Sequence, residues 1–221
     1  MIDKQTGLNL LPHDVRMVRE GSDLIMSSNI PMGVVVDRTA DWLHNWAETT
    51  PDNVFLAGRT EAGWREVTFK QALETVRRIA TSLGARNLGQ DTPIVILSGN
   101  SVNHALLSFG AQYAGVPTVP LAEQYSLINE AHGRMIYVLD KVRPAMAYTD
   151  DARLYAAALA LPQLDGVEIV ATRTDGAPGA VTSFASLVDG DANQDADALL
   201  AQTGPDTIAK ILFTSGSSSD P

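Results

Sequence analysis

Short apolar runs alternate with segments of helical periodicity through most of this chain, and this alternation limits its fold more than any other feature. The apolar runs that are suited to buried strands are residues 93–97, 116–121, 145–148, 167–171 and 208–213. The segments between the first four have the spacing of helices, at 104–114, 127–142 and 152–161. Strands separated by helices of this length are typical of βαβ units. The sequence therefore predicts an α/β fold with a largely parallel sheet and helices on both faces.

A helix is expected just upstream of this alternating region. Thr39 is suited to cap its start, and Pro51 would end it. Trp42 and Trp46 then share one helical face, and we expect both in the core.

A hairpin and a second helix follow in the sequence. Residues 54–57 and 65–67 have strand character and are separated by a turn around Gly63. Thr68 and Gln71 have the three-residue spacing of a capping box, which predicts that a helix begins there. Its apolar face would contain Ala72, Leu73, Val76, Ile79, Ala80 and Leu83.

The first 36 residues lack clear periodicity and contain Pro12, Pro31 and Gly33. We therefore expect an extended N-terminal arm over residues 1–36. The predicted α/β domain would then occupy residues 37–221.

Composition excludes several classes of function. The formal net charge of −10 argues against nucleic acid or an anionic membrane as a partner. The absence of cysteine excludes disulfides and thiolate metal sites. We find no signal-peptide core and no apolar run of about 20 residues, so we expect a cytoplasmic protein. The four histidines include no close metal-ligand pair, and we expect no metal site within this chain.

The segment with the most distinctive chemistry follows the last predicted strand. It contains Thr214, Ser215, Gly216, Ser217, Ser218 and Ser219. Hydroxyl groups and closely approaching backbone amides can surround a phosphate, and glycine permits that approach. The chain has no Walker-type Gly-x-x-x-x-Gly-Lys-[Ser/Thr] motif. From spacing alone, an ordinary turn or flexible tail remains the alternative to a phosphate site.

Residues 212–221 resemble the signature loop of the adenylate-forming superfamily, which includes acyl-CoA synthetases, adenylation domains and luciferases. Here the segment is Leu-Phe-Thr-Ser-Gly-Ser-Ser-Ser-Asp-Pro, and the family's loop is usually Thr-Ser-Gly-[Ser/Thr]-Thr-Gly-x-Pro-Lys. Ser218 keeps the hydroxyl of the usual threonine, whereas Ser219 replaces the usual glycine. The expected lysine would follow Pro221.

The resemblance continues upstream, in the family's order, from about Pro31. Residues 95–105 resemble the early strand–turn–helix of these enzymes, and residues 113–120 resemble the next helix exit and strand. Within the superfamily, residues 98–101 with His104, and residues 123–127, resemble most closely those of bacterial feruloyl-CoA synthetases. The substrates of that group are hydroxycinnamic acids.

The resemblance implies a two-step ligase reaction that uses ATP, Mg²⁺ and coenzyme A. A carboxylic acid, here a hydroxycinnamate such as ferulate, would form an acyl-adenylate and then a CoA thioester. Residues 214–219 would bind the ATP phosphates, with the role of Ser219 open. His104 would line the acyl pocket or make a structural hydrogen bond.

The family's remaining motifs lie downstream of Pro221, so we expect no catalytic side chain in this chain and no turnover by it alone. It would be the incomplete N-terminal portion of the large adenylate-forming domain. The alternatives are another adenylating enzyme, such as a fatty-acid–CoA ligase, and a non-catalytic fragment or interaction module.

Overall fold

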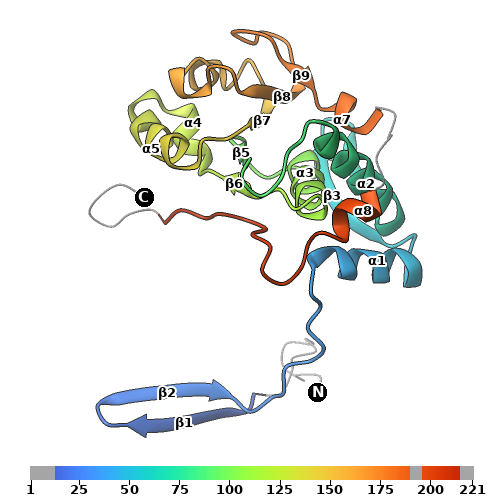
Figure 1. Ribbon diagram of the computed structural model, residues 1–221, viewed down its shortest axis with the longest axis vertical. Coiled ribbons are helices and arrows are strands. Elements are labelled where there is room, and N and C mark those ends of the chain that lie inside the picture. The colour runs from blue at the N-terminus through green and yellow to red at the C-terminus, as the bar shows by residue number, and fades with distance from the viewer. Residues whose placement is uncertain (1–12, 190–195, 215–221) are drawn as a thin grey trace. The chain divides into compact units, whose positions relative to one another are not determined.

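The computed structural model describes residues 13–189 and 196–214, and the chain divides into two compact units, Met1–Val36 and Asp37–Pro221 (Figure 1). The described part of the first unit contains an antiparallel hairpin of β1 (Val15–Glu20) and β2 (Asp23–Ser28). Gly21 has a φ of +62° in the turn, a conformation that glycine adopts without strain.

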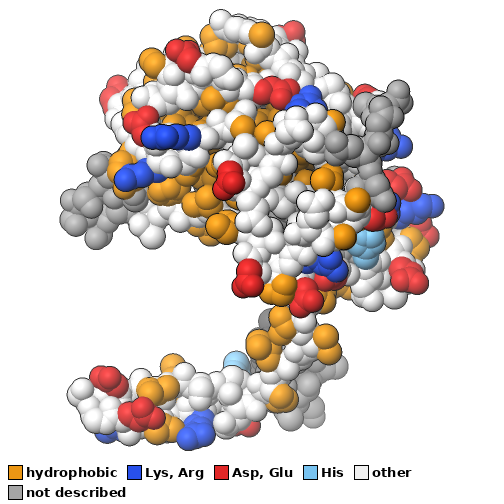
Figure 2. Space-filling model, in the orientation of Figure 1, with side chains coloured by type: hydrophobic (Ala, Val, Ile, Leu, Met, Phe, Trp, Pro, Cys, Tyr) orange, Lys and Arg blue, Asp and Glu red, His pale blue; other side chains and the backbone are white. Residues whose placement is uncertain are grey.

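The hairpin carries exposed apolar side chains. Met17 lies directly opposite Met26, and Arg19 lies opposite Leu24, so these four side chains share one face. Met17, Leu24 and Met26 are all exposed, and hydrophobic side chains are visible along both strands in Figure 2. The sequence predicted only an extended arm here, because charged residues interrupt the alternation of apolar side chains in β1.

The second unit contains a five-stranded parallel sheet. Its strands are β5 (Ile94–Ile96), β6 (Thr118–Pro120), β7 (Met146–Asp151), β8 (Glu168–Arg173) and β9 (Thr182–Ser183). They pair in the order β6-β5-β7-β8-β9, and every pairing is parallel. The predicted parallel sheet is therefore confirmed.

Helices cover both faces of this sheet (Figure 1). Successive strand residues point to opposite faces, so Ile94 and Ile96 pack in one hydrophobic cluster and Val95 packs in the other. The first cluster includes side chains of α1 (Thr39–Thr49), α2 (Phe69–Ala85), α3 (Val102–Tyr113), α7 (Ala185–Asp189) and α8 (Ala196–Leu200). The second includes side chains of α5 (His132–Val142) and α6 (Ala156–Leu159).

The predicted hairpin and capping box are present ahead of the sheet. The hairpin consists of β3 (Val54–Thr60) and β4 (Gly63–Thr68), which pair antiparallel. At the start of α2, the Gln71 amide donates to Thr68 Oγ1 at 3.3 Å, and the Thr68 amide donates to Gln71 Oε1 at 2.9 Å. Each side chain thus satisfies a backbone amide that has no partner within the helix.

The tryptophan prediction for the first helix was wrong. Trp42 and Trp46 are 46% and 41% exposed, and the buried residues of α1 are Ala40 and Leu43. Helical spacing placed the two rings on one face, but it did not specify that the smaller side chains would face the core. Thr39 begins the helix itself, and its hydroxyl donates to Gln112 of α3 at 2.7 Å.

Two predicted helices are shorter than expected. In the segment 127–142, α4 (Glu123–Leu127) ends at Leu127, and the extended backbone of Ile128 separates it from a 3₁₀ turn (Asn129–Ala131). The α-helix of this segment is α5, which begins at His132. A second 3₁₀ turn, Pro162–Leu164, follows α6. In the segment 152–161, only α6 is helical.

Candidate functional site

The predicted phosphate segment follows a stretch that runs beside β6. Thr118 and Lys210 form a parallel bridge, in which the Thr118 amide donates to the Ala209 carbonyl and the Ile211 amide donates to the Thr118 carbonyl, at 3.3 and 2.9 Å. This is one bridge rather than the full strand expected over 208–213. Because the pairing is parallel, the chain after Lys210 runs toward the edge where β5, β6, β7 and β8 end.

Of the predicted phosphate-binding residues, Thr214 is described, and it is exposed. Ser215, Gly216, Ser217, Ser218 and Ser219 lie outside the described residues. Their role therefore stays a prediction. In open parallel sheets, ligands bind at the carboxyl ends of the strands, so the side chains at this edge form the rest of the candidate site.

Asp150, at the end of β7, accepts hydrogen bonds from three hydroxyl groups. Ser101 Oγ donates to Asp150 Oδ1 at 3.0 Å, Thr172 Oγ1 does so at 3.4 Å, and the Tyr148 hydroxyl is the third donor. Burial raises the pKa of Tyr148 well above its usual range, and the charge of Asp150 raises it further. Tyr148 therefore remains a hydrogen-bond donor at neutral pH and holds the Asp150 carboxylate in place.

Glu123 connects the loops that follow β5, β6 and β7. It lies in the first turn of α4, and its Oε1 accepts a hydrogen bond from the Tyr155 hydroxyl. A Cβ added to Gly99 would lie 3.0 Å from Glu123 Oε2, so glycine leaves room for this carboxylate. Burial raises the pKa of Tyr155, and the hydrogen bond and charge of Glu123 add to that effect.

His104 lies in the first turn of α3 and is half-buried. Its Nδ1 is 3.1 Å from the carbonyl oxygen of Gly99, and its backbone amide donates to the Ser101 hydroxyl, which caps the helix, at 3.0 Å. This places His104 at the same edge as Glu123. These contacts support a structural hydrogen-bonding role for His104. That His104 lines an acyl pocket stays a prediction.

Asp151 shapes the loop that follows β7. Its Oδ1 accepts from the amides of Arg153 and Leu154 at 3.0 and 3.2 Å, and its Oδ2 lies 2.8 Å from the Arg173 guanidinium. Burial acts to raise the pKa of Asp151, but these amides and the guanidinium outweigh it and hold the pKa below its usual value. The turn they form delays the start of α6, which explains why the predicted helix 152–161 is short.

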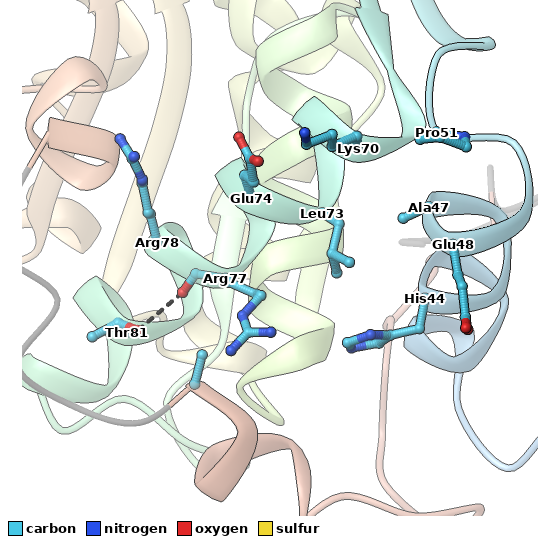
Figure 3. Close-up of a pocket in the computed structure, with 11 residues that line it drawn as sticks. His44, Ala47, Glu48, Pro51, Lys70, Leu73, Glu74, Arg77, Arg78 and Thr81 are labelled. Atoms are coloured by element: carbon cyan, nitrogen blue, oxygen red, sulfur yellow. Dashed lines mark hydrogen bonds between the residues drawn. The ribbon is translucent and has the colours of Figure 1, made fainter.

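A groove of about 830 Å³ lies between α1 and α2 (Figure 3). His44 from α1 and Arg77 from α2 point toward one another across it. Glu74 and Lys70 lie nearer the start of α2. The Thr81 hydroxyl donates to the Arg77 carbonyl at 3.0 Å.

A chain of hydrogen bonds runs under this groove and connects four helices. His44 Nε2 is 2.9 Å from the Tyr113 hydroxyl, which donates to Asp197 Oδ1 at 2.7 Å. Arg77 Nη2 lies 2.7 Å from Asp197 Oδ2. No sequence pattern predicts this cluster, because its members come from α1, α2, α3 and α8 and have no common spacing.

Two findings concern metals and membranes. Among residues 13–189 and 196–214, no group of three or more His, Asp or Glu side chains could hold a metal ion. Within the same described ranges, the structure has no helix with the length and apolar character needed to span a bilayer.

Comparison with known proteins identifies relatives of the chain. The family described as AMP-binding enzyme matches residues 43–221. A curated relative is the 3-[(3aS,4S,7aS)-7a-methyl-1,5-dioxo-octahydro-1H-inden-4-yl]propanoyl:CoA ligase of Rhodococcus jostii (strain RHA1). It is 26% identical over 161 residues, and the match covers 68% of this chain and 30% of that ligase. The chain thus spans less than a third of that relative's length.

Solved structures share the fold. The N-terminal subdomain of Klebsiella oxytoca NpsA, in complex with 3-hydroxybenzoyl-AMSN, has a TM-score of 0.58 at 17% identity, over 84% of this chain and 40% of that one. A benzoate CoA ligase from Burkholderia xenovorans LB400 has a TM-score of 0.52 at 18% identity, over 68% and 28%. The family match covers well over half of the chain, and the chain therefore belongs to the AMP-binding enzyme family.

Proposed function

We propose that this chain is the N-terminal part of an ATP-dependent acid–CoA ligase. In the first step, a carboxylate attacks the α-phosphate of ATP and gives an acyl-adenylate and pyrophosphate. In the second step, the thiol of coenzyme A displaces AMP and gives the thioester. One observation carries the proposal: in a chain of the AMP-binding family, a hydroxyl-rich segment starts at Thr214 after a stretch that runs parallel to β6.

The proposed role of this segment is to hold the phosphates. The hydroxyls of Thr214, Ser215, Ser217 and Ser218, with the backbone at Gly216, would donate to the β- and γ-phosphates. Donors placed there stabilise the charge that moves onto the departing pyrophosphate. Ser219 would contribute an amide, at the cost of strain if its backbone needs a positive φ.

Mg²⁺, when bound, would neutralise phosphate charge. The described residues supply no cluster of carboxylates for it, so we assign no residue of this chain to the metal.

The proposed acid is a hydroxycinnamate such as ferulate. Support comes from residues 98–101, His104 and residues 123–127, which resemble those of feruloyl-CoA synthetases and follow β5 and β6 at the carboxyl edge of the sheet. The Rhodococcus relative and the Burkholderia structure are named as CoA ligases for other acids, a bicyclic propanoate and benzoate. They support the reaction class and leave the acid to be tested.

Pyrophosphate release by the complete ligase that contains this chain tests the proposal. Ferulate, benzoate and a long-chain fatty acid would each be supplied with ATP, with and without coenzyme A. We expect the highest kcat/KM with ferulate and formation of a CoA thioester. Activation of the fatty acid alone would favour the alternative adenylating enzyme, and failure to activate any acid would contradict the proposal.

A double variant tests the phosphate segment in the same assay. Ser217→Ala with Ser218→Ala removes two hydroxyl donors, and we expect kcat/KM to fall by at least about 100-fold. Hydrogen bonds to charged groups contribute about 1.5–3 kcal/mol each, and a tenfold loss is about 1.4 kcal/mol. Ser22→Ala makes the same change in the exposed turn of the β1–β2 hairpin and should leave the rate unchanged. Equal rates for all three proteins would exclude this role for the segment.

A further inference from the structure

A second polar pocket, of about 280 Å³, shares Ser101 and Asp150 with the candidate site at the carboxyl edge of the sheet, and it adds arginine side chains to which the proposed ligase reaction assigns no role. The β3–β4 hairpin lines one side of it, and the start of α3 and the ends of β7 and β8 line the other. The residues on which the argument depends are Arg59, Arg65, Asn103, Asp150, Thr172 and Arg173.

Arginine side chains from three strands converge on this pocket. Arg59 comes from β3, Arg65 from β4 and Arg173 from β8. Within the described part of the chain, neither Arg59 nor Arg65 forms an ion pair with a carboxylate, whereas Arg173 pairs with Asp151. Asp150 is the one acidic residue in the lining. The pocket is therefore locally cationic in a protein whose net charge is −10.

The pocket is held in shape by packing and hydrogen bonds. A Cβ on Gly58 would lie 2.9 Å from Val102 Cγ2, so glycine lets the hairpin approach α3 closely. Arg65 Nη1 donates to Asn103 Oδ1 at 2.8 Å, and Asn103 Nδ2 donates to Thr172 Oγ1 at 3.0 Å. Because Asn103 is only 6% exposed, this contact fixes the guanidinium beside the pocket.

The hydrogen bonds to the Asp150 carboxylate all go to one of its two oxygens. All three hydroxyl donors to Asp150 bind Oδ1, and Oδ2 accepts no hydrogen bond from residues 13–189 or 196–214. A carboxylate oxygen can accept a hydrogen bond from a ligand but cannot donate one. An anion that enters this pocket must therefore carry a hydrogen of its own to be tolerated beside Asp150.

We propose that this pocket binds an inorganic phosphate-class anion that keeps a proton at neutral pH, either hydrogen phosphate or pyrophosphate. The guanidinium groups of Arg59, Arg65 and Arg173 donate to its charged oxygens. Its remaining hydroxyl donates to Asp150 Oδ2. Sulfate has similar size and charge but no proton at neutral pH, so Asp150 repels it and selects against it.

Calorimetric titration of the 221-residue chain at pH 7 and matched ionic strength tests the proposal. The probes are inorganic phosphate, pyrophosphate and sulfate. We expect phosphate or pyrophosphate to bind at least tenfold more tightly than sulfate. Tighter pyrophosphate binding would identify the released product of an adenylation reaction as the source, and tighter phosphate binding would identify free phosphate. Equal binding of sulfate, or no binding of any anion at millimolar concentration, would overturn the proposal.

Variants locate the binding. Arg59→Gln removes a guanidinium that lies over the Trp64 ring, 5.8 Å from its centre, and it should weaken phosphate binding about tenfold. Arg78→Gln is the matched control, because Arg78 is exposed on α2 and does not line this pocket. Equal losses in both variants would show non-specific attraction and overturn the assignment.

Two further variants separate the roles of Asp150 and the predicted phosphate segment. Asp150→Asn keeps an acceptor for Tyr148 but removes the negative charge, so the preference for phosphate over sulfate should fall to about one. Ser217→Ala with Ser218→Ala should leave anion binding intact, because the proposal assigns the anion to the arginines and Asp150 and gives neither serine a role. Loss of phosphate binding in that double variant would move the site to the segment and contradict the proposal. Thermal unfolding of each variant confirms that it is folded.

Discussion

The buried hydroxyl of Tyr148 makes the stability of the protein sensitive to alkaline pH. Burial and the neighbouring Asp150 raise its pKa in the folded state above the value of about 10 expected in the unfolded chain. The folded state therefore holds this proton more tightly. The contribution to stability is complete below about pH 10 and is lost as pH rises from there toward the folded pKa.

We expect Tyr148→Phe to reduce the loss of unfolding free energy between about pH 9 and pH 11. Urea denaturation at a series of pH values measures this slope. The double variant with Tyr155→Phe should reduce it further, because the pKa of Tyr155 is also raised. An alkaline slope identical to that of the unmodified chain in both variants would exclude the two tyrosines as its source.

Asp151 should have the opposite effect at acidic pH. Its pKa is lowered in the folded state, so its contribution to stability is present above about pH 4 and is lost as pH falls through the folded pKa. We expect Asp151→Asn to have a shallower loss of stability between about pH 4 and pH 2. The same denaturation series provides the measurement, and an unchanged acid slope would contradict the assigned contacts with Arg153, Leu154 and Arg173.

At the scale of elements, the contact between α2 and α3 depends on Gly110. A Cβ added there would lie 2.4 Å from Ile79 Cγ2 and 2.7 Å from Ile79 Cβ, closer than the packed core can accommodate. We expect Gly110→Ala to destabilise the chain by about 1–3 kcal/mol through overpacking, measured by urea denaturation.

Gly133→Ala is the matched control in α5. A Cβ at Gly133 would meet no atom within 4 Å, and alanine is the better helix former, so this variant should be neutral or more stable by about 0.5–1 kcal/mol. Equal destabilisation by the two substitutions would show that close approach of the helices is not the cause.

The elements that the sequence predicted well are those with a strong local pattern. The capping box at Thr68, the hairpin turn at Gly63 and the buried strand β5 each follow from residues adjacent in the chain. Elements set by distant contacts were missed. The two-residue strand β9 exists because Thr182 and Ser183 pair with β8, and neither residue has a strand pattern of its own. The extended backbone of Ile128 likewise has no preceding glycine or proline to signal it.

For the whole molecule, the alternation of strands and helices predicted the sheet, and the parallel order places its carboxyl ends along one edge. The polar residues at that edge include His104 and those after β5 that the sequence had singled out. The cationic pocket was not predicted, because Arg59, Arg65 and Arg173 come together only after the β3–β4 hairpin packs beside the ends of β7 and β8. No local spacing encodes that arrangement.

Hydrogen exchange in the presence of ATP tests the central claim most directly. The claim is that residues 214–219 of this AMP-binding family chain hold the phosphates of ATP. Backbone exchange would be followed by mass spectrometry with and without ATP, in the unmodified chain and in the Ser217→Ala, Ser218→Ala double variant. We predict slower exchange at 214–219 on addition of ATP and a smaller effect in the double variant. Unchanged exchange at 214–219 at saturating ATP would contradict the claim and favour a non-catalytic fragment.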